Sequence, residues 1–429
     1  MSVIPAALAA ADALAGGIGL LDRLIEPEQL VALAERRSGL HEFGDAPFQQ
    51  PLQRLLTAGV NEAALSVVGR FALRWDTLRF LGNLLRLRAA ESHTPAILET
   101  PVEKPIFITG LPRSGTTFLH RLLLEDRRNQ APLVWQTVDP YPARGPDHTI
   151  RQVSRELRIF ELLAPEFRDL HPLHAESPQE CSEITAHVFR SLRFDTTYRI
   201  PSYRSWLDRD GHLPAYRFER RFLQHLAHRY GARRWVLKCP DHLFALDDLR
   251  AEFPDARIIF VHRDPLKVLA SVAKLTEVLR RPFSRRVDPI EIGRQESARW
   301  LDGAERMMRA CRQGGFAEPI FHVHYLDLIA DPLRTVASVY RHFDLELDLV
   351  VADRVSRAVA KHPNGGYGRH AYRLEDHGLD PQAEAEKFGR YVEYFVIEQE
   401  DELRYTSPAL RERSPRDSAA GEGGAAAGS

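Results

Sequence analysis

Residues 105–125 read PIFITGLPRSGTTFLHRLLLE and decide the fold that we expect for this chain. The first six residues form a short apolar run with β-branched side chains that ends at Gly110, which is typical of a buried strand. From Ser114 onward the apolar residues recur at helical spacing. The stretch therefore predicts a strand, a tight loop and a helix in direct succession.

The loop of this unit, from Gly110 to Thr117, has the composition of an anion-binding site. Successive backbone N–H groups at a helix N-terminus bind phosphate, and small residues let a phosphate approach closely. The two glycines have the separation of the GxxxxGK[ST] loop of nucleotide triphosphatases. Thr116 stands where that motif needs lysine, and the positive charge lies inside the loop as Arg113. This departure argues against ordinary ATP or GTP hydrolysis.

Three later apolar runs predict further buried strands, each followed by a helical stretch. The strands are RWVLK (234–238), ARIIFVH (256–262) and IFHVHY (320–325), and the helices are 243–252, 265–280 and 332–343. Helix starts are indicated by Asp264-Pro265, Asp331-Pro332, Asp380-Pro381 and a capping box at Ser177-Pro178-Gln179-Glu180. Strands that alternate with helices predict the α/β class, with a mostly parallel sheet covered on both faces.

We expect three regions along the chain. Residues 1–100 form a helical N-terminal region, residues 101–405 the main domain, and residues 406–429 a disordered tail rich in Gly, Ala and Ser. The first 25 residues lack a basic leader and carry Asp12 and Asp22 within the apolar stretch, so an amphipathic helix is a better interpretation than a signal peptide or a membrane span.

Composition narrows the function classes. Lys+Arg is 58 and Asp+Glu is 59 in 429 residues, and this balance disfavours a nucleic-acid-binding protein. The three cysteines are far apart and form no CxxC pair, which excludes a disulfide scaffold and a Cys-rich zinc site and fits a cytoplasmic protein. No clustered spacing of Asp and His predicts a metal site, and we expect none.

A second constellation lies in FVHRDPLKVLASVAKL (260–275). A strand ends at Arg263, and Ser271 follows eight residues later, about two turns along the next helix. An arginine at a strand end with a hydroxyl on the following helix can hold a second phosphate. By itself, Arg-Asp at a helix start is more often only a cap.

Together the two motifs resemble the sulfotransferases that use 3′-phosphoadenosine 5′-phosphosulfate. PRSGTTFLH is similar to that family's 5′-phosphosulfate loop, and RIIFVHRDPLKVLAS to its 3′-phosphate motif. Tyrosylprotein sulfotransferases contain a stretch similar to VLKCPDHLFALDDLRAEFPDARIIFVHRDP. The family's Tyr-Glu-Asp segment is similar to HYLDLIADPLRTVASVYRHF. The resemblance covers about residues 105–400. It implies a P-loop-like fold with a central parallel sheet flanked by helices.

The resemblance also implies a set of donor-binding residues. The loop would hold the 5′-phosphate and the sulfuryl group, Phe118 and Tyr325 would lie against adenine, and Arg263 with Ser271 would bind the 3′-phosphate. Leu326 replaces the usual Glu after Tyr325, and the match of Arg369 to a late phosphate contact is loose. The full set is Arg113, Ser114, Gly115, Thr116, Thr117, Phe118, Arg263, Ser271, Tyr325 and Arg369.

The predicted catalytic residues are Lys238, His242 and Glu180. Lys238, one of only six lysines, ends a predicted strand, and the equivalent lysine of the family stabilises the leaving group. The general base is less clear, because Gln136 occupies the place of the glutamate of tyrosylprotein relatives and cannot be a base. Among His242, Glu180 and His120 we favour His242, since histidine titrates near neutral pH. Glu180 is also explained by its capping box.

We therefore predict a cytoplasmic sulfotransferase that moves a sulfuryl group to a hydroxyl of a small or lipid-like acceptor. A P-loop small-molecule kinase and a catalytically inactive nucleotide-binding protein of the same fold remain as alternatives. Residues 139–215 and the N-terminal helices are the expected acceptor walls. The side chains of Phe160, Leu163, Phe167, Phe189, Phe194 and Trp206 are equally consistent with an acceptor lining and with core packing. A homo-oligomer is compatible with the sequence.

Overall fold

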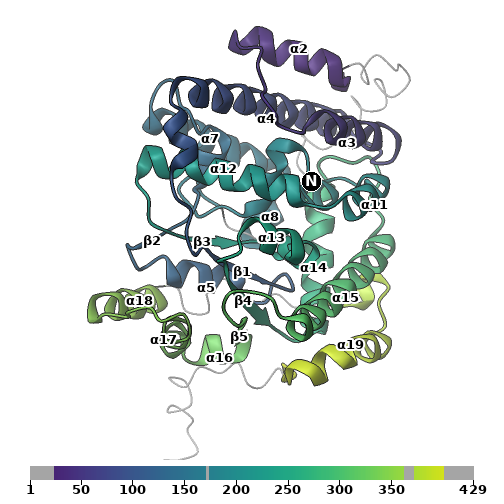
Figure 1. Ribbon diagram of the computed structural model, residues 1–429. Helices are drawn as coiled ribbons and strands as arrows, with labels where there is room; N and C mark the ends of the chain where they lie inside the picture. The colour runs from purple at the N-terminus through teal and green to yellow at the C-terminus, as the bar shows by residue number, and fades with distance from the viewer. Residues whose placement is uncertain (1–23, 171–172, 362–371, 401–429) are drawn as a thin grey trace, which may run out of the picture.

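The computed structural model of the protein describes residues 24–170, 173–361 and 372–400 (Figure 1). Within these residues a parallel sheet of five strands lies at the centre, in the order β2-β3-β1-β4-β5. The strands are β1 (Ile106–Gly110), β2 (Asn129–Gln130), β3 (Arg234–Lys238), β4 (Arg257–His262) and β5 (Phe321–His324). The four longer strands confirm the predicted ones, and β2 is too short to leave a pattern in the sequence.

Helices cover both faces of the sheet, because successive strand residues point to opposite sides. In β4, Ile258 and Phe260 belong to one hydrophobic cluster, and Ile259 and Val261 to another. The first face is covered by α12 (Leu213–Tyr230), α13 (Leu246–Glu252), α14 (Pro265–Arg280), α15 (Pro289–Gln313) and α19 (Pro381–Phe395). The second is covered by α5 (Thr116–Leu123), α16 (Tyr325–Ala330), α17 (Pro332–His342) and α18 (Leu349–Lys361). The predicted α/β fold class is confirmed.

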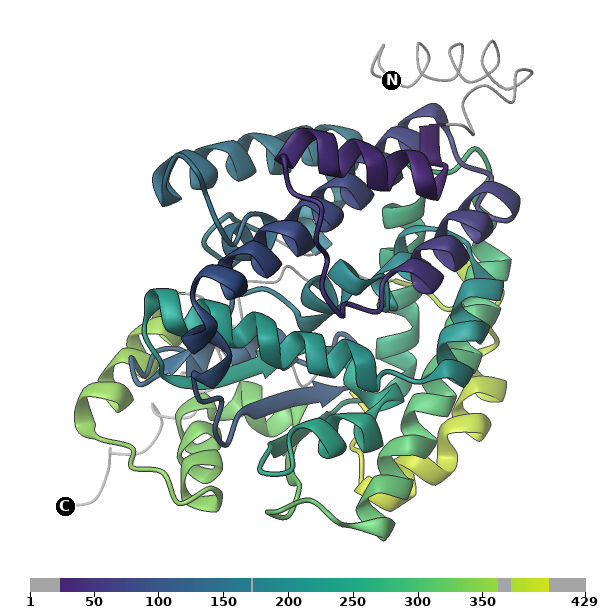
Figure 2. The same cartoon turned by 45° about the horizontal axis from the view of Figure 1, so that its top comes forward.

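The N-terminal helices form a layer on the side of the sheet that carries α12 (Figures 1 and 2). They are α2 (Pro27–Ser38), α3 (Gln49–Asn61) and α4 (Val67–His93), followed by the short 3₁₀ helix η2 (Pro95–Glu99). Their apolar side chains share one hydrophobic cluster with α12 and the first face of the sheet. The predicted amphipathic helix at the start of the chain and the predicted tail fall in segments 1–23 and 401–429, outside the described residues.

Short elements between β2 and β3 fold back over the end of the sheet. They are α6 (Val134–Val138), α7 (Pro146–Leu163), α8 (Pro165–Leu170), α9 (Cys181–Thr185), η3 (Ala186–Val188), α10 (Arg193–Thr197) and α11 (Pro201–Asp210). Two further 3₁₀ helices are η4 (Pro240–Phe244) and η6 (Glu375–His377).

The predicted capping box before α9 is wrong. The helix begins at Cys181, so Glu180 stands at the cap position, where its side chain makes no capping hydrogen bond. Pro178 instead pairs with Leu133 in an isolated antiparallel bridge, and Ser177 Oγ accepts a hydrogen bond from the backbone of His174. The three Asp-Pro helix starts are confirmed, because each aspartate accepts a backbone hydrogen bond in α14, α17 and α19. The Glu180 carboxylate is thereby available for another role.

Gly110 ends β1 where the backbones of β1 and β4 come closest. It is paired with Val261 and has a φ of +152°. A Cβ added at Gly110 would lie 2.2 Å from the carbonyl oxygen of Val261, which belongs to a backbone that cannot move aside. The glycine at the start of the loop is therefore required by strand packing.

We expect Gly110→Ala to destabilise the protein by about 3 kcal/mol, because it adds a backbone clash at an unfavourable φ. Gly82→Ala in α4 is the matched control, since an added Cβ there meets no heavy atom within 4 Å among the described residues. That variant should be neutral or more stable by about 0.5–1 kcal/mol, as for alanine in a helix interior. Urea unfolding measures both changes, and equal stability of the two variants would contradict the packing argument.

Candidate active site

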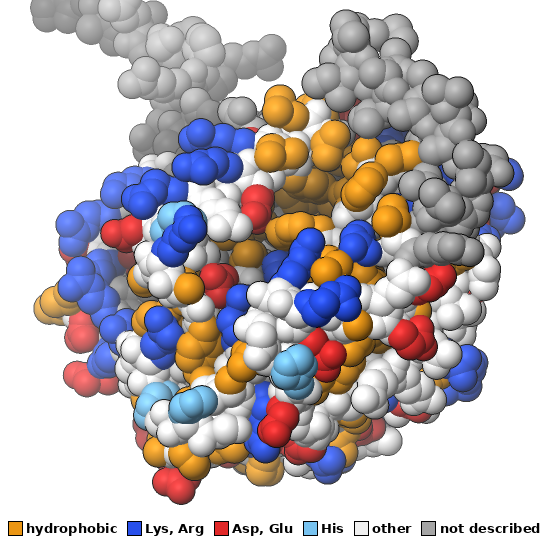
Figure 3. All heavy atoms as spheres, turned by 90° about the horizontal axis from the view of Figure 1, so that it is seen from above, with side chains coloured by type: hydrophobic (Ala, Val, Ile, Leu, Met, Phe, Trp, Pro, Cys, Tyr) orange, Lys and Arg blue, Asp and Glu red, His pale blue; other side chains and the backbone are white. Residues whose placement is uncertain are grey.

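A cavity of about 1190 Å³ opens at the carboxyl edge of the sheet. Ligands bind at this edge in open α/β folds, because the loops after parallel strands meet there. The lining includes a residue shortly after each of four strands, namely Arg113, Asp241, Arg263 and Tyr325. The face of the molecule in Figure 3 is hollowed, and hydrophobic side chains border the hollow.

The loop after β1 has the backbone of an anion cradle. Gly115 caps α5 with a φ of +94°, and a Cβ there would lie 2.9 Å from the Tyr325 ring. Arg113 has a φ of +61°, a conformation that non-glycine residues rarely adopt and that marks functional sites. The Ser114 hydroxyl is fully buried and has no hydrogen-bond partner among the described residues. A loop with an unsatisfied buried hydroxyl at a helix N-terminus fits a bound phosphate.

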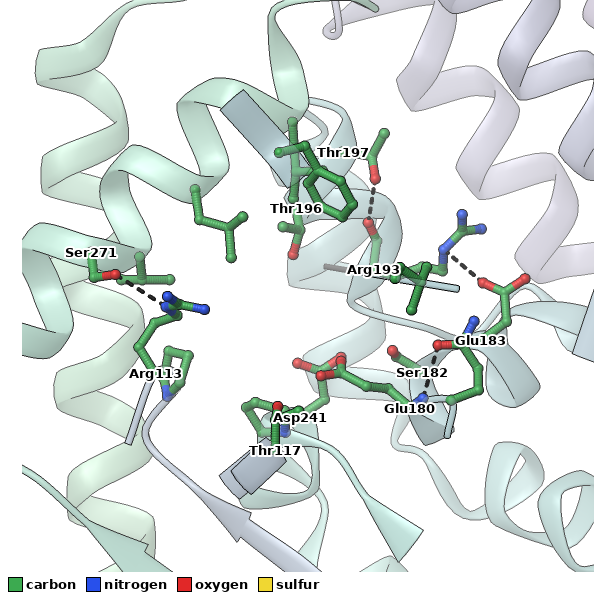
Figure 4. A pocket seen from close by; sticks show the side chains of 18 of the residues that line it. Arg113, Thr117, Glu180, Ser182, Glu183, Arg193, Thr196, Thr197, Asp241 and Ser271 are labelled. Atoms are coloured by element: carbon green, nitrogen blue, oxygen red, sulfur yellow. Dashed lines mark hydrogen bonds and ion pairs between the residues drawn. The ribbon is translucent and has the colours of Figure 1, made fainter. Parts of the chain in front are cut away.

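The two predicted phosphate motifs meet in space, although they lie far apart in the chain. Arg113 Nε donates a hydrogen bond to Ser271 Oγ at 3.1 Å (Figure 4), and Arg263 donates to the backbone oxygen of Arg113 at 2.6 Å. The Arg263 guanidinium also lies 4.0 Å from the centre of the Tyr325 ring. These contacts join the ends of β1, β4 and β5 into a single basic site.

Glu400 is an acidic partner in this site that the sequence analysis missed. It is buried, and its two carboxylate oxygens accept hydrogen bonds from Arg263 Nε and a terminal nitrogen of the same guanidinium at 2.6 and 2.8 Å. A two-point ion pair is the geometry with which guanidinium also holds phosphate. An anion that binds Arg263 therefore competes with Glu400.

The other predicted donor residues gather around the same end of the cavity. Thr116, Thr117 and Phe118 open α5 and line it, with Phe118 also packing in the hydrophobic cluster beneath. Arg369 falls in segment 362–371, outside the described residues.

Lys238 is the last residue of β3, as the apolar run before it predicted. It lies beside the phosphate loop. Its side chain is buried, and Nζ donates a hydrogen bond to Thr117 Oγ1 at 3.1 Å. Nζ also forms an ion pair with the Glu180 carboxylate. Glu180 and Thr117 line the cavity, so the Lys238 ammonium lies directly behind two residues of the wall.

Asp241 is a second carboxylate of this wall, and it was not among the predicted site residues. Figure 4 shows Asp241 and Glu180 pointing into the same part of the cavity. Burial, and next the negative charge of Glu180, raise the pKa of Asp241 to about 7, against an opposing effect of Arg299. Its place directly after Lys238-Cys239-Pro240, at a strand end, was the signal that could have identified it.

The structure places His242 outside the cavity. Its buried ring hydrogen-bonds through Nδ1 to the Tyr216 hydroxyl at 2.8 Å and meets Phe107 edge to face. It belongs to a buried cluster with Cys181 and Glu219, whose hetero atoms lie within 4.8 Å of one another. Burial lowers the pKa of His242 to about 3, so the ring is neutral but has no route to a substrate in the cavity.

The other two side chains considered for the base position also point elsewhere. His120 Nε2 donates to the carbonyl oxygen of Val236 at 2.9 Å inside the core, and burial lowers its pKa to about 3. Gln136 Oε1 accepts from the backbone of Leu133 at 2.9 Å and so caps α6. Neither residue lines the cavity described above.

Four charged side chains form a closed ring in another wall of the cavity. Arg79 pairs with Asp76 at 2.8 Å and Glu183 at 2.6 Å, and Arg193 pairs with the same two residues at 3.0 and 3.1 Å. Burial raises the pKa of Asp76, but the charges of Arg193 and Arg79 outweigh it and leave the pKa below its usual value. The ring ties α4 and α10 to α9, directly after Glu180, and it was not predicted.

Much of the remaining cavity wall is apolar and comes from helices. Val153, Leu157, Phe160 and Leu163 lie on α7, Phe167 on α8, Val272, Leu275 and Leu279 on α14, and Ala72 and Trp75 on α4. Phe160, Leu163 and Phe167 therefore line the cavity, which agrees with the acceptor-lining interpretation of these side chains. Phe189, Phe194 and Trp206 lie in the hydrophobic core.

Comparison with known proteins identifies sulfotransferases as relatives of this chain. A sequence profile described as "Sulfotransferase family" matches residues 105–348. The omega-hydroxy-beta-dihydromenaquinone-9 sulfotransferase Stf3 of Mycobacterium tuberculosis is 26% identical over 323 residues, which are 71% of this chain and 79% of the relative.

No helix in the described part of the chain is long and apolar enough to cross a membrane.

Two solved structures share the architecture. The crystal structure of sulfotransferase STF1 from Mycobacterium tuberculosis is 33% identical, with a TM-score of 0.73, and the match covers 84% of this chain and 97% of that one. Sulfotransferase STF9 from Mycobacterium avium is 28% identical, with a TM-score of 0.77, and the match covers 87% and 97%.

Proposed function

The chain belongs to the sulfotransferase family, and we propose that it transfers a sulfuryl group from 3′-phosphoadenosine 5′-phosphosulfate to a hydroxyl group of a lipid-like acceptor. The observation that carries the proposal is the position of Lys238. Its buried ammonium links Thr117 of the phosphate loop to the Glu180 carboxylate at the wall of a large apolar cavity. The family relationship sets the kinase alternative aside.

The donor would bind at the basic end of the cavity. The backbone N–H groups of residues 114–117 and the Ser114 hydroxyl suit the 5′-phosphate, and Arg263 with Ser271 suits the 3′-phosphate. In the structure Glu400 and Arg113 already contact Arg263 and Ser271. We therefore propose that donor binding exchanges these protein contacts for contacts to phosphate.

Glu180 is the general base in this proposal, in preference to His242. It lines the cavity next to Lys238, whereas His242 is enclosed behind the wall. The acceptor oxygen attacks sulfur as the bond from sulfur to the 5′-phosphate oxygen breaks, and Glu180 takes the hydroxyl proton. Lys238 and Arg113 neutralise the charge that develops on the leaving bisphosphate. The argument for a catalytically inactive protein was that Gln136, which cannot be a base, occupies the place of the relatives' glutamate. Glu180 supplies a carboxylate in this proposal, so that argument no longer applies.

The apolar walls support a lipid-like acceptor. A cavity of about 1190 Å³ lined mainly by aliphatic and aromatic side chains binds a large apolar molecule, with a few polar groups that fix its orientation. The relative Stf3 is named for a dihydromenaquinone that carries an omega-hydroxyl group. We propose an acceptor of that general kind, with a terminal hydroxyl on an apolar chain.

The compartment and the metal requirement are further parts of the proposal. The three cysteines, Cys181, Cys239 and Cys311, are all free thiols, which fits the cytoplasm. Lys238 and Arg113 supply the positive charge that a metal ion supplies in other group-transfer sites, so we propose transfer without a metal.

Arg263→Ala should weaken the binding of adenosine 3′,5′-bisphosphate by about 10–150-fold, the usual cost of losing a charged partner of a phosphate. Glu400→Gln is the matched variant, and we expect it to change the bisphosphate affinity in the opposite direction or not at all. It removes a competing carboxylate and should bind the bisphosphate at least as tightly as the wild type. Calorimetric titration of the three proteins measures this, and equal affinity of Arg263→Ala and the wild type would remove the 3′-phosphate assignment.

Glu180→Gln should lower kcat by about 10²–10⁴-fold and leave the bisphosphate affinity nearly unchanged, because the variant keeps the shape of the side chain but cannot accept a proton. His242→Gln and Asp241→Asn are the controls and should keep most of the turnover if they fold, which thermal unfolding checks. Loss of turnover in a folded His242→Gln protein, with Glu180→Gln active, would assign the base to the histidine instead.

Sulfuryl transfer should continue at its full rate in excess EDTA, because fixed side-chain cations provide the charge stabilisation. The measurement is bisphosphate release with and without chelator, followed by addition of magnesium. A loss of activity that magnesium restores would refute the metal-independent mechanism.

A further inference from the structure

Four large hydrophobic side chains are exposed on the two helices that border the apolar part of the cavity. On α4, Phe71 and Trp75 are 54% and 46% exposed, and on α7, Ile159 and Leu162 are 59% and 70% exposed. Trp75 and Ile159 also line the cavity. The apolar lining thus continues without a break onto the outer surface, and we call these four side chains the rim. Exposed apolar side chains gathered in this way mark interaction sites rather than the ordinary scatter of surface residues.

α7 has the pattern of a helix that lies in a membrane interface. Its inner side, with Leu157, Phe160 and Leu163, lines the cavity. On its outer side Arg151, Arg155 and Arg158 are exposed and lead directly to the rim at its C-terminal end. Arginines that border exposed apolar residues are typical of interfacial helices, because their long stems extend along apolar surface to reach headgroups.

A second basic segment borders the rim on the side of α4. The sequence RRPFSRR (280–286) runs beside the start of α4, where Phe283 O accepts a hydrogen bond from the backbone of Ser66 and Arg285 N donates to Ala64 O. Phe283 lines the cavity, while Arg285 and Arg286 are exposed. In Figure 3, Lys and Arg side chains lie beside the hollow that hydrophobic side chains border.

We propose that this rim docks on an anionic lipid bilayer, so that an acceptor passes from the membrane directly into the cavity. The inference rests on the proposed lipid-like acceptor and assigns the surface through which it enters. The rim would insert among the acyl chains, and the exposed arginines of α7, together with Arg285 and Arg286, would contact lipid phosphates. A bilayer suits the surface better than a folded partner, because the apolar rim is continuous with a cavity for a single extended molecule.

The test is flotation of the full-length protein with vesicles of phosphatidylglycerol and phosphatidylcholine, in the absence of donor. We expect binding that weakens as salt is raised. The double variant Phe71→Ser/Leu162→Ser should reduce vesicle binding by about tenfold or more, because two apolar side chains no longer insert. Neither residue lines the cavity, so the affinity for adenosine 3′,5′-bisphosphate and the turnover of a short-chain alcohol in solution should stay unchanged.

Leu349→Ser/Val350→Ser on α18 is the control, since these side chains are also exposed but lie away from the cavity lining. It should bind vesicles as the wild type does. The docking surface would be overturned if the wild type did not bind vesicles, or if the rim variant bound them equally well. This holds even if the enzyme transfers a sulfuryl group to a detergent-solubilised lipid alcohol. Light scattering measures whether the wild type is a dimer. A dimer that the rim substitutions dissociate into monomers would overturn the membrane-docking proposal in favour of self-association. Vesicle binding without any sulfuryl transfer would support the surface and refute the proposed acceptor.

Discussion

The in-register parallel pairing of β1 with β3 on one side and β4 on the other is the constraint on which the site depends. Ile108 pairs with Lys238, and Gly110 with Val261, so the three strands end within three residues of each other. The phosphate loop, the Lys238 ammonium and Arg263 are therefore brought together by backbone hydrogen bonds. The close approach at Gly110 then fixes where the loop leaves the sheet.

Several buried charges in the described part of the chain are matched by a partner of opposite sign. Lys238 pairs with Glu180, Arg263 with Glu400, and Arg79 with Asp76 and Glu183. An unpaired ion in a low-dielectric wall is costly, whereas a paired ion keeps its charge and its position. The charged groups near the reacting atoms are thus held in place before a substrate arrives, which limits the reorganisation that transfer requires.

The sequence predicted the elements that carry the proposed donor-site residues, because the signals for these elements are local. The strand, the loop and the following helix are contiguous, and Arg263 and Lys238 both stand at strand ends that apolar runs reveal. The acid–base side depended on tertiary structure. Asp241 rather than His242 lines the cavity because of the direction of one 3₁₀ helix, η4. Glu180 meets Lys238 only because a segment 58 residues away folds back over β3. Likewise, Asp76 and Arg79 on α4 resemble ordinary surface charges until α9 and α10 cover them.

The two ends of the cavity come from different parts of the chain. Residues after the strand ends form the basic end, whereas α4 and α7 supply much of the apolar end. The family profile begins at residue 105, so α4, which contributes Trp75, Asp76 and Arg79, lies outside it. Substitutions on α4 can therefore change the apolar end without altering the strand ends that form the basic end. A descendant that exchanges residues on these helices can acquire a new acceptor while it inherits the donor chemistry intact, and so one catalytic core can serve many lineages.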